Sequence, residues 1–181
     1  MHKDILTLFK RLQIALHQGG LENDYLKPKQ IICLQSLFLH IDVVAVLPTG
    51  YEKSMIFQLL PSFLPKKTSR NIVIVVSPLS SIIEGQIKIL RNRGIVVNVF
   101  STHCHKEEEV DLFNNDIDKN EPNYWGVSVD VWSGALDILF THPEDILSES
   151  GRKLMNSDIF QKNVVAYVVD EAHCIEGCNI N

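Results

Sequence analysis

The feature that most constrains the fold is a series of short apolar runs, each closed by a polar turn. Residues 72–76 and 164–169 are continuously apolar and mostly β-branched, which is typical of strands covered on both faces, as in a parallel sheet. Apolar residues at helical spacing follow the first run. This alternation predicts an α/β domain with a mostly parallel β-sheet flanked by helices. Further strands are predicted at residues 43–47, 96–100, 127–131 and 136–141.

Size and charge narrow the possible functions. At 181 residues with 45% hydrophobic content, the chain is long enough for one well-buried domain. Its 17 Lys plus Arg and 22 Asp plus Glu give a net charge of −5, so it lacks the basic footprint of a domain that holds nucleic acid by charge alone. Any contact with nucleic acid must come from a few loops and backbone amides.

The apolar runs and the cysteines indicate a protein that is neither secreted nor inserted in a membrane. Uninterrupted apolar runs are far shorter than a membrane span, and the N-terminus interleaves charge with apolar residues, unlike a signal peptide. The four cysteines show no small-domain disulfide framework: Cys33, Cys104, Cys174 and Cys178. They indicate reduced thiols in a nuclear or cytoplasmic protein.

The chain is expected to divide into an N-terminal helix and linker, residues 1–24, and a main domain, residues 25–181. An apolar stripe runs through residues 3–18 and ends at Gly19-Gly20. A second helix is predicted to begin at Pro28, because proline suits the first helical position. A third, beginning at Lys53, is predicted to stop at Pro61.

Residues 43–54 have the layout of a phosphate-binding loop: an apolar strand, a turn, and then Lys53-Ser54 opening a helix. Such a loop directs backbone N–H groups and a helix N-terminus at a polyphosphate, with the Lys on the β/γ-phosphates and the hydroxyl on Mg²⁺. Taken alone, the pattern does not distinguish a nucleotide site from an ordinary turn. The candidate nucleotide-binding residues are Pro48, Thr49, Gly50, Tyr51, Glu52, Lys53 and Ser54.

Two adjacent carboxylates, Asp170 and Glu171, leave the last predicted strand at its carboxyl end. Charged residues at this position can simply mark the end of a strand where the chain reaches solvent. Beside a Lys-Ser turn they acquire roles: Asp170 would share a Mg²⁺ with Ser54, and Glu171 would activate water against the γ-phosphate. Because ligands of open parallel sheets bind at the carboxyl ends of the strands, we expect Lys53 and the acidic pair to be neighbours.

Five segments, in order along the chain, resemble the motifs of the RecQ family of superfamily 2 DNA helicases. Asp170-Glu171-Ala172-His173, followed by Cys174-Ile175, resembles motif II, and Leu26-Lys27-Pro28-Lys29-Gln30 resembles motif 0. Residues 47–54 are similar to motif I, residues 77–83 with Gln86 to motif Ia, and residues 139–144 to motif Ib. Together they span about residues 26–176, which makes the resemblance far more specific than any single motif.

The resemblance implies a first RecA-like domain, the ATP-binding half of a helicase that moves 3′ to 5′ along DNA. It implies that Gln30 reads the adenine, that Lys53 contacts the β/γ-phosphates, and that Ser54 and Asp170 hold Mg²⁺. Glu171 would be the hydrolytic base, and His173 would relay the nucleotide state towards DNA. Alternatively, Gln30 is an ordinary surface residue and His173 a structural histidine. The implied contacts to single-stranded or partly duplex DNA are Ser77, Pro78, Leu79, Ser80, Thr141 and Pro143.

Glu52 departs from this pattern, because the family has Gly before the Lys. A Glu held at positive φ costs about 1–2 kcal/mol, and a carboxylate 4 Å from a phosphate charge adds a repulsion of up to about 4 kcal/mol. We therefore expect ATP binding to be weakened by roughly one to three orders of magnitude. The alternative function is a degenerate helicase-like module that binds nucleic acid or a partner chain without hydrolysing ATP.

Two further expectations concern the C-terminus and metals. The chain ends at Asn181, without the second RecA-like domain that carries the family's arginine finger, so we expect little or no unwinding by this chain alone. Soft ligands at residues 103–105, with His173, Cys174 and Cys178, leave a zinc site as an alternative. Their spacing lacks Cys-x-x-Cys, which argues against zinc.

Overall fold

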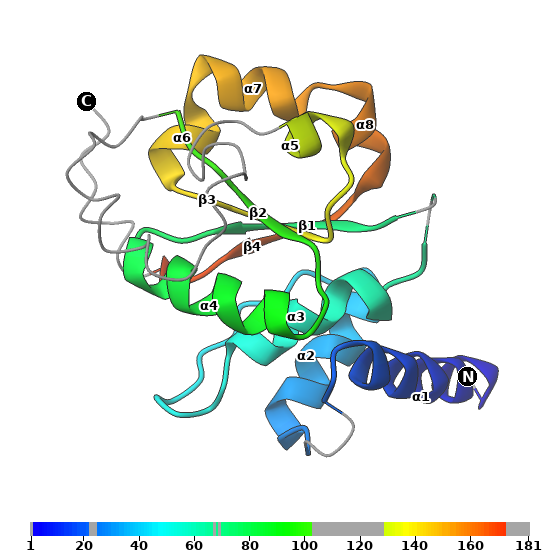
Figure 1. Cartoon of the computed structure of the whole chain (residues 1–181). Helices are drawn as coiled ribbons and strands as arrows, with labels where there is room; N and C mark the ends of the chain where they lie inside the picture. The colour runs from blue at the N-terminus through cyan, green and yellow to red at the C-terminus, as the bar shows by residue number, and fades with distance from the viewer. Residues whose placement is uncertain (1, 22–24, 67, 69, 103–128, 173–181) are drawn as a thin grey trace.

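The computed structural model describes residues 2–21, 25–66, 68, 70–102 and 129–172. Four parallel strands form one sheet in the order β2-β3-β1-β4 (Figure 1). The predicted α/β class with a parallel sheet is confirmed. The strands are β1 (Ile72–Val76), β2 (Val97–Phe100), β3 (Ile138–Thr141) and β4 (Val164–Val169).

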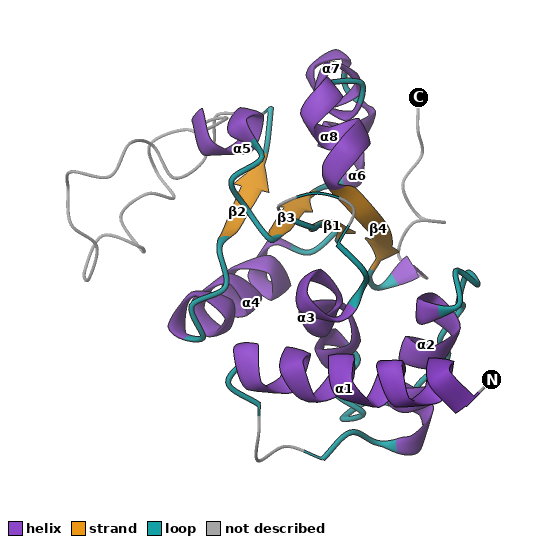
Figure 2. Ribbon diagram, turned by 90° about the vertical axis from the view of Figure 1, so that its right-hand side faces the viewer, coloured by secondary structure: helices purple, strands orange, loops and turns teal. Residues whose placement is uncertain are grey.

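Helices cover both faces of the sheet (Figures 1 and 2). One face carries α1 (His2–Gln18), α2 (Pro28–Phe38), α3 (Ser54–Phe63) and α4 (Ser80–Asn92). The opposite face carries α5 (Val129–Ser133), α6 (Pro143–Leu147), α7 (Glu149–Met155) and α8 (Asp158–Asn163). No helix in the described part of the chain is long and apolar enough to cross a membrane.

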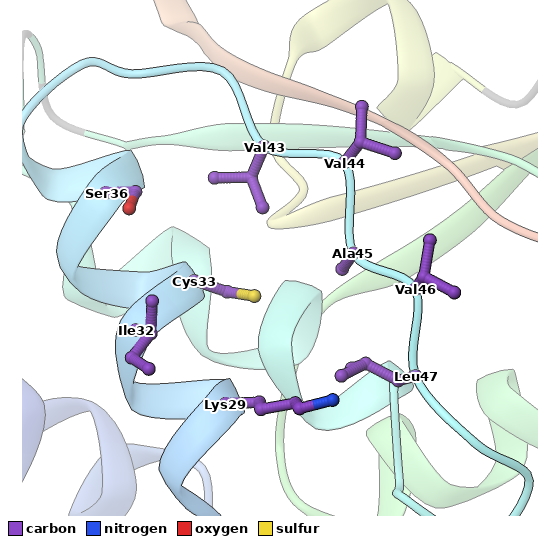
Figure 3. Close-up of a pocket in the computed structure, with 9 residues that line it drawn as sticks. All are labelled: Lys29, Ile32, Cys33, Ser36, Val43, Val44, Ala45, Val46 and Leu47. Atoms are coloured by element: carbon purple, nitrogen blue, oxygen red, sulfur yellow. The ribbon is translucent and has the colours of Figure 1, made fainter.

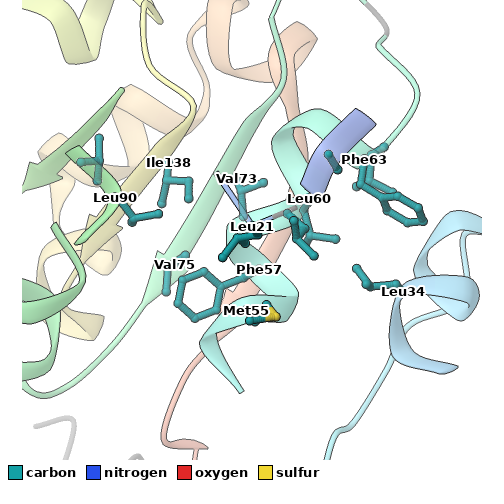
Figure 4. Packing of buried hydrophobic residues seen from close by; sticks show 14 of the residues in the cluster. Leu21, Leu34, Met55, Phe57, Leu60, Phe63, Val73, Val75, Leu90 and Ile138 are labelled. Atoms are coloured by element: carbon teal, nitrogen blue, oxygen red, sulfur yellow. The ribbon is translucent and has the colours of Figure 1, made fainter. Parts of the chain in front are cut away.

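The strand β1 contributes to two hydrophobic clusters. Val73 and Val75 pack in a cluster with residues of α1 to α4, including Phe63 (Figure 4). Ile72 and Ile74 alternate with them and pack in a second cluster with α7 and α8. Because both faces are buried, every position of this strand is apolar.

The N-terminal helix confirms its prediction and packs on α3. Leu8, Leu12 and Ala15 are buried in the same cluster as Phe63. Gly20 has φ 63°, the left-handed conformation in which helices commonly end. Arg11 Nη1 also donates to the Leu64 carbonyl at 3.3 Å, so α1 is fastened to the end of α3 by polar as well as apolar contacts.

The predicted strand at residues 43–47 is wrong. This segment runs as extended chain beside α2 (Figure 3) and belongs to no strand of the sheet. Val44 and Val46 are 94% and 84% exposed. An apolar β-branched run favours extended backbone, but a strand also needs hydrogen bonds to a neighbouring strand. Residues 43–47 have no such neighbour in the described structure, where β4, an edge strand, pairs only with β1.

Two smaller predictions are also corrected. Residues 129–133 form the helix α5 instead of continuing a strand from residue 127, and residues 127 and 128 lie outside the described ranges. The stretch is too short for its period to separate helix from strand. Pro61 lies inside α3 instead of stopping it. It removes one N–H near the helix end, and Asn71 Nδ2 donates to its carbonyl at 3.1 Å.

Candidate nucleotide-binding site

Three strands bring their last residues to one edge of the sheet. The Asp170 N–H, just beyond β4, donates to the Val76 carbonyl at 2.9 Å. The Ser77 N–H, just beyond β1, donates to the Thr141 carbonyl at 3.0 Å. The ladder therefore continues past the strands and holds the acidic pair and the motif Ia and Ib segments side by side.

The turn before α3 is closed by a backbone hydrogen bond and contains a glycine at positive φ. The Tyr51 N–H donates to the Pro48 carbonyl at 3.2 Å, and Gly50 has φ 77°, which glycine adopts without steric cost. Thr49 lies between them, and α3 begins at Ser54 directly after the turn. The helix N-terminus, which favours anions, therefore adjoins the turn.

Gln30, on the first turn of α2, is fully buried and fastens this loop. Its Nε2 donates to the carbonyls of Tyr51 and Glu52, both at 3.0 Å, and its Oε1 accepts from the Lys27 N–H at 2.7 Å. The alternative of an ordinary surface residue does not hold. Contact between Gln30 and adenine stays a prediction. The structure shows in addition that Gln30 is hydrogen-bonded to the loop backbone.

Glu52 adopts the conformation that was expected to be costly, with φ 54°. Its carboxylate Oε2 lies 3.2 Å from Lys27 Nζ. Lys27 Nζ also donates to the Gly50 carbonyl at 2.9 Å and lies 5.2 Å from the centroid of the Tyr51 ring. No role for Lys27 was predicted from the sequence, because a pairing between two motifs 25 residues apart becomes visible only in three dimensions.

Lys53 and Glu171, separated by 118 positions in the sequence, are neighbours. Lys53 Nζ donates to Glu171 Oε1 at 3.4 Å, with the two side chains 40% and 21% exposed. Glu171 has φ 51°, so its backbone is held in a conformation that costs a non-glycine residue energy. The predicted proximity of the Lys-Ser turn and the acidic pair is confirmed.

Both carboxylates of the acidic pair are partly buried, and burial changes the pKa of Asp170. Burial raises the pKa of its carboxyl above the ordinary value of 3.8, and the charge of Glu171 adds to this. A hydrogen bond from the Glu171 N–H and the charge of Lys53 lower the pKa in opposition. A carboxylate and the Ser54 hydroxyl are oxygen ligands that Mg²⁺ accepts, and a divalent cation would favour the ionised carboxylate that burial opposes.

The predicted DNA-contacting residues divide by exposure. Ser77 and Thr141 are buried, with 1% and 0% exposure, so their side chains are enclosed by the protein. Leu79 and Ser80 are exposed at the start of α4, and Pro143 is half-buried at the start of α6. Pro78, between Ser77 and Leu79, is also half-buried.

His142 links the two segments on which these residues lie. Its Nε2 lies 3.3 Å from Ser80 Oγ, and the side chain is 8% exposed. The resemblance implies that His142, within the segment similar to motif Ib, lies at the single-strand backbone, and it predicts no contact with Ser80. Its position directly before Pro143, at the end of a buried strand, was the available signal.

Several predicted residues cannot be placed. His173 and the zinc candidates at residues 103–105, 174 and 178 all lie outside the described residues. Within the described residues, no group of three or more His, Cys, Asp or Glu side chains is arranged to hold a metal ion. The described Mg²⁺ candidates are thus Ser54 and Asp170.

A cavity of about 210 Å³ lies between α2 and the extended segment 43–47 (Figure 3). Its lining is mostly apolar and includes Cys33, whose thiol has a pKa raised by burial. Lys53, Ser54, Asp170 and Glu171 are not among the lining residues. The candidate residues therefore lie at the carboxyl ends of the strands and outside this cavity.

Comparison with known proteins agrees with this geometry. Residues 27–179 match the family model of the DEAD/DEAH box helicases. The chain is 29% identical over 150 residues to ATP-dependent helicase SGS1 of Saccharomyces cerevisiae, covering 82% of this chain and 9% of that protein. It is 30% identical over 135 residues to ATP-dependent DNA helicase Q5 of Rattus norvegicus, covering 74% of this chain and 12% of that protein.

A bacterial relative gives the same picture. ATP-dependent DNA helicase RecQ of Synechocystis is 26% identical over 152 residues, which cover 84% of this chain and 27% of that protein. The chain therefore spans only a minor part of the relatives that it matches. The resemblance to RecQ-type helicases is confirmed, and the family model covers most of the chain, including the loop around Lys53 and the acidic pair. The chain belongs to the DEAD/DEAH box helicase family.

Proposed function

We propose that the chain is the ATP-binding and nucleic-acid-binding first domain of a RecQ-like 3′–5′ DNA helicase. The observation that carries the proposal is the 3.4 Å contact between Lys53 Nζ and Glu171 Oε1. It joins the cation needed at the β/γ-phosphates to the carboxylate needed at the attacking water. ATP and Mg²⁺ are the cofactors that this pairing implies.

The ion pair defines the first step of the proposed mechanism. Lys53 would exchange Glu171 for the β/γ-phosphates when nucleotide binds. The released carboxylate would accept the proton of a water whose oxygen bonds to the γ-phosphorus, while the bond from that phosphorus to the β,γ-bridging oxygen breaks and ADP leaves. Ser54 and Asp170 would hold Mg²⁺, which neutralises charge on the phosphates when it is bound. Gln30 keeps the turn at residues 51 and 52 in place through its two backbone hydrogen bonds.

The remainder of the function needs groups beyond these residues. We assign single-strand contact to the face that carries the exposed Leu79 and Ser80 and the half-buried Pro143, and the relay role to His173. A second helicase half, on the same or a partner chain, would supply the arginine that typically adds about 10³–10⁵ in rate. We therefore expect little or no unwinding by these 181 residues alone. We expect the protein to be located with the cell's DNA, which in a eukaryote is in the nucleus.

The test is ATP hydrolysis with and without single-stranded DNA. Wild type is compared with Lys53→Ala and with Lys153→Ala, which removes an exposed lysine of α7. Without the arginine of a second half we expect slow phosphate release, measured in a single turnover with enzyme in excess, that single-stranded DNA stimulates, that Lys53→Ala removes and that Lys153→Ala leaves unchanged. Equal rates in wild type and Lys53→Ala would contradict the proposal.

A second candidate is favoured by one observation, the φ of 54° at Glu52. A strained loop carrying a carboxylate suits a module that binds DNA or a partner chain without turning ATP over. Nucleotide titration against wild type and Glu52→Gly separates the two candidates. Tighter binding by Glu52→Gly, together with wild-type DNA binding in the absence of hydrolysis, would favour the module.

A further inference from the structure

Glu52 brings a negative charge into a loop that is proposed to bind a polyanion. Of the other acidic groups near the turn, Asp170 is influenced by the charge of Lys53. Lys53 is already paired with Glu171. Glu52 forms an ion pair with Lys27, whose Nζ lies 3.2 Å from the Glu52 Oε2.

We propose that Lys27 is a positioning residue that compensates for Glu52, so that this loop can accept phosphate despite its carboxylate. The inference rests on the proposed function and extends it to a residue pair particular to this loop. Lys27 makes three contacts with the turn: the ion pair to Glu52, the hydrogen bond to the Gly50 carbonyl at 2.9 Å, and the cation over the Tyr51 ring. The ion pair holds the Glu52 carboxylate beside Lys27, the residue that precedes α2.

Neighbouring groups support a role in ligand binding more than a role in folding. The side chains of Lys27 and Glu52 are 35% and 59% exposed, and an ion pair this open to solvent adds little to stability. The loop backbone is held independently by Gln30, through the carbonyls of Tyr51 and Glu52. Removing the ammonium of Lys27 therefore leaves the fold in place and leaves Glu52 without its partner at the phosphate-binding turn.

The experiment is a double-mutant cycle on nucleotide affinity, using the 181-residue chain. Trinitrophenyl-ATP fluorescence reports binding to wild type, Lys27→Met, Glu52→Gly and the double variant. Tripolyphosphate, which has no base or sugar, is used as a competitor. Lys27→Arg restores the charge, and Lys29→Met makes the same charge change at an exposed lysine two residues along. Circular dichroism melting verifies that each variant is folded.

Lys27→Met is expected to raise the Kd for the probe and for tripolyphosphate by about tenfold in the wild-type background. In the Glu52→Gly background the same change is expected to cost less than about twofold, because the carboxylate is absent. Lys27→Arg recovers most of the loss, and Lys29→Met has no comparable effect.

Other outcomes overturn the inference in distinguishable ways. An equal loss in both backgrounds would show that Lys27 acts independently of Glu52, and the inference would fail while the proposed function stands. A loss for the probe but not for tripolyphosphate would assign Lys27 to the base or sugar. Absence of binding in all variants, including Glu52→Gly, would overturn the inference and the proposed function together.

Discussion

Lys53 Nζ lies 3.4 Å from Glu171 Oε1, so that the cation and the carboxylate to which we assign separate roles in hydrolysis form an ion pair. Each would have to release the other for ATP to be bound and cleaved. On the proposed function, the ion pair would compete with the nucleotide for Lys53, and its strength would set part of the cost of nucleotide binding. This relationship gives the first prediction.

Glu171→Gln is expected to separate binding from hydrolysis. The amide cannot act as a general base, so hydrolysis should fall by about 10²-fold or more. The neutral side chain also competes less for Lys53, so ATP affinity should stay the same or rise. Calorimetric titration and phosphate-release assays measure the two quantities. A parallel loss of affinity and hydrolysis would mean that Glu171 contributes to nucleotide binding itself.

Gln30→Ala is expected to destabilise the fold. The side chain is fully buried, and its removal leaves a cavity and the loop carbonyls of Tyr51 and Glu52 without their donor. Such losses cost about 2–4 kcal/mol of the free energy of unfolding. Urea denaturation measures this cost, with Gln35→Ala, an exposed glutamine on the same helix, as the matched control. Equal urea midpoints for the two variants would show that the hydrogen bonds of Gln30 to the loop do not stabilise the fold.

Two of the longest apolar runs are predictable as strands, although only one of these strands is buried on both faces. Residues 72–76 and 164–169 are predicted as strands and form β1 and β4. Burial on both faces is confirmed for β1, whereas β4 is an edge strand in which Tyr167 and Val169 are 62% and 51% exposed. Residues 43–47 share the apolar character but lie outside the sheet. Local sequence indicates extended backbone there and contains no information about which strand edge is available.

The candidate site divides in a similar way. Lys53, Ser54, Asp170 and Glu171 could be chosen because each residue type has a fixed chemical use at its position. Lys27 and His142 could not, because their partners, Glu52 and Ser80, come from distant segments. Nor could the sequence show that the side chain of Gln30 would point at the loop backbone.

Asp170→Asn is expected to change the pH dependence of stability. Burial raises the folded-state pKa of Asp170 above its ordinary value of 3.8, so the folded protein binds more protons than the unfolded chain in the window that begins there. Its contribution to stability therefore falls as pH rises through that window. The asparagine does not titrate, so its melting temperature relative to wild type should be higher at pH 7 than at pH 4.

The control for this prediction is Asp42→Asn, which changes an exposed aspartate. Its melting temperature relative to wild type should vary much less between the two pH values. A difference for Asp170→Asn that decreases as pH rises would indicate that the attraction to Lys53, and not burial, dominates the environment of this carboxylate.

Leu79→Glu is expected to weaken binding of single-stranded DNA. Leu79 is 42% exposed at the start of α4, on the face that we assign to the DNA backbone. A carboxylate there repels phosphate, and the Kd for an oligonucleotide should rise by about fivefold or more at low salt. Ile89→Glu is the matched control, because it places the same charge on the same helix at a residue of similar exposure, 44%. Fluorescence anisotropy should show little change for Ile89→Glu, and equal effects of the two substitutions would mean that the DNA responds to net charge and not to this face of the domain.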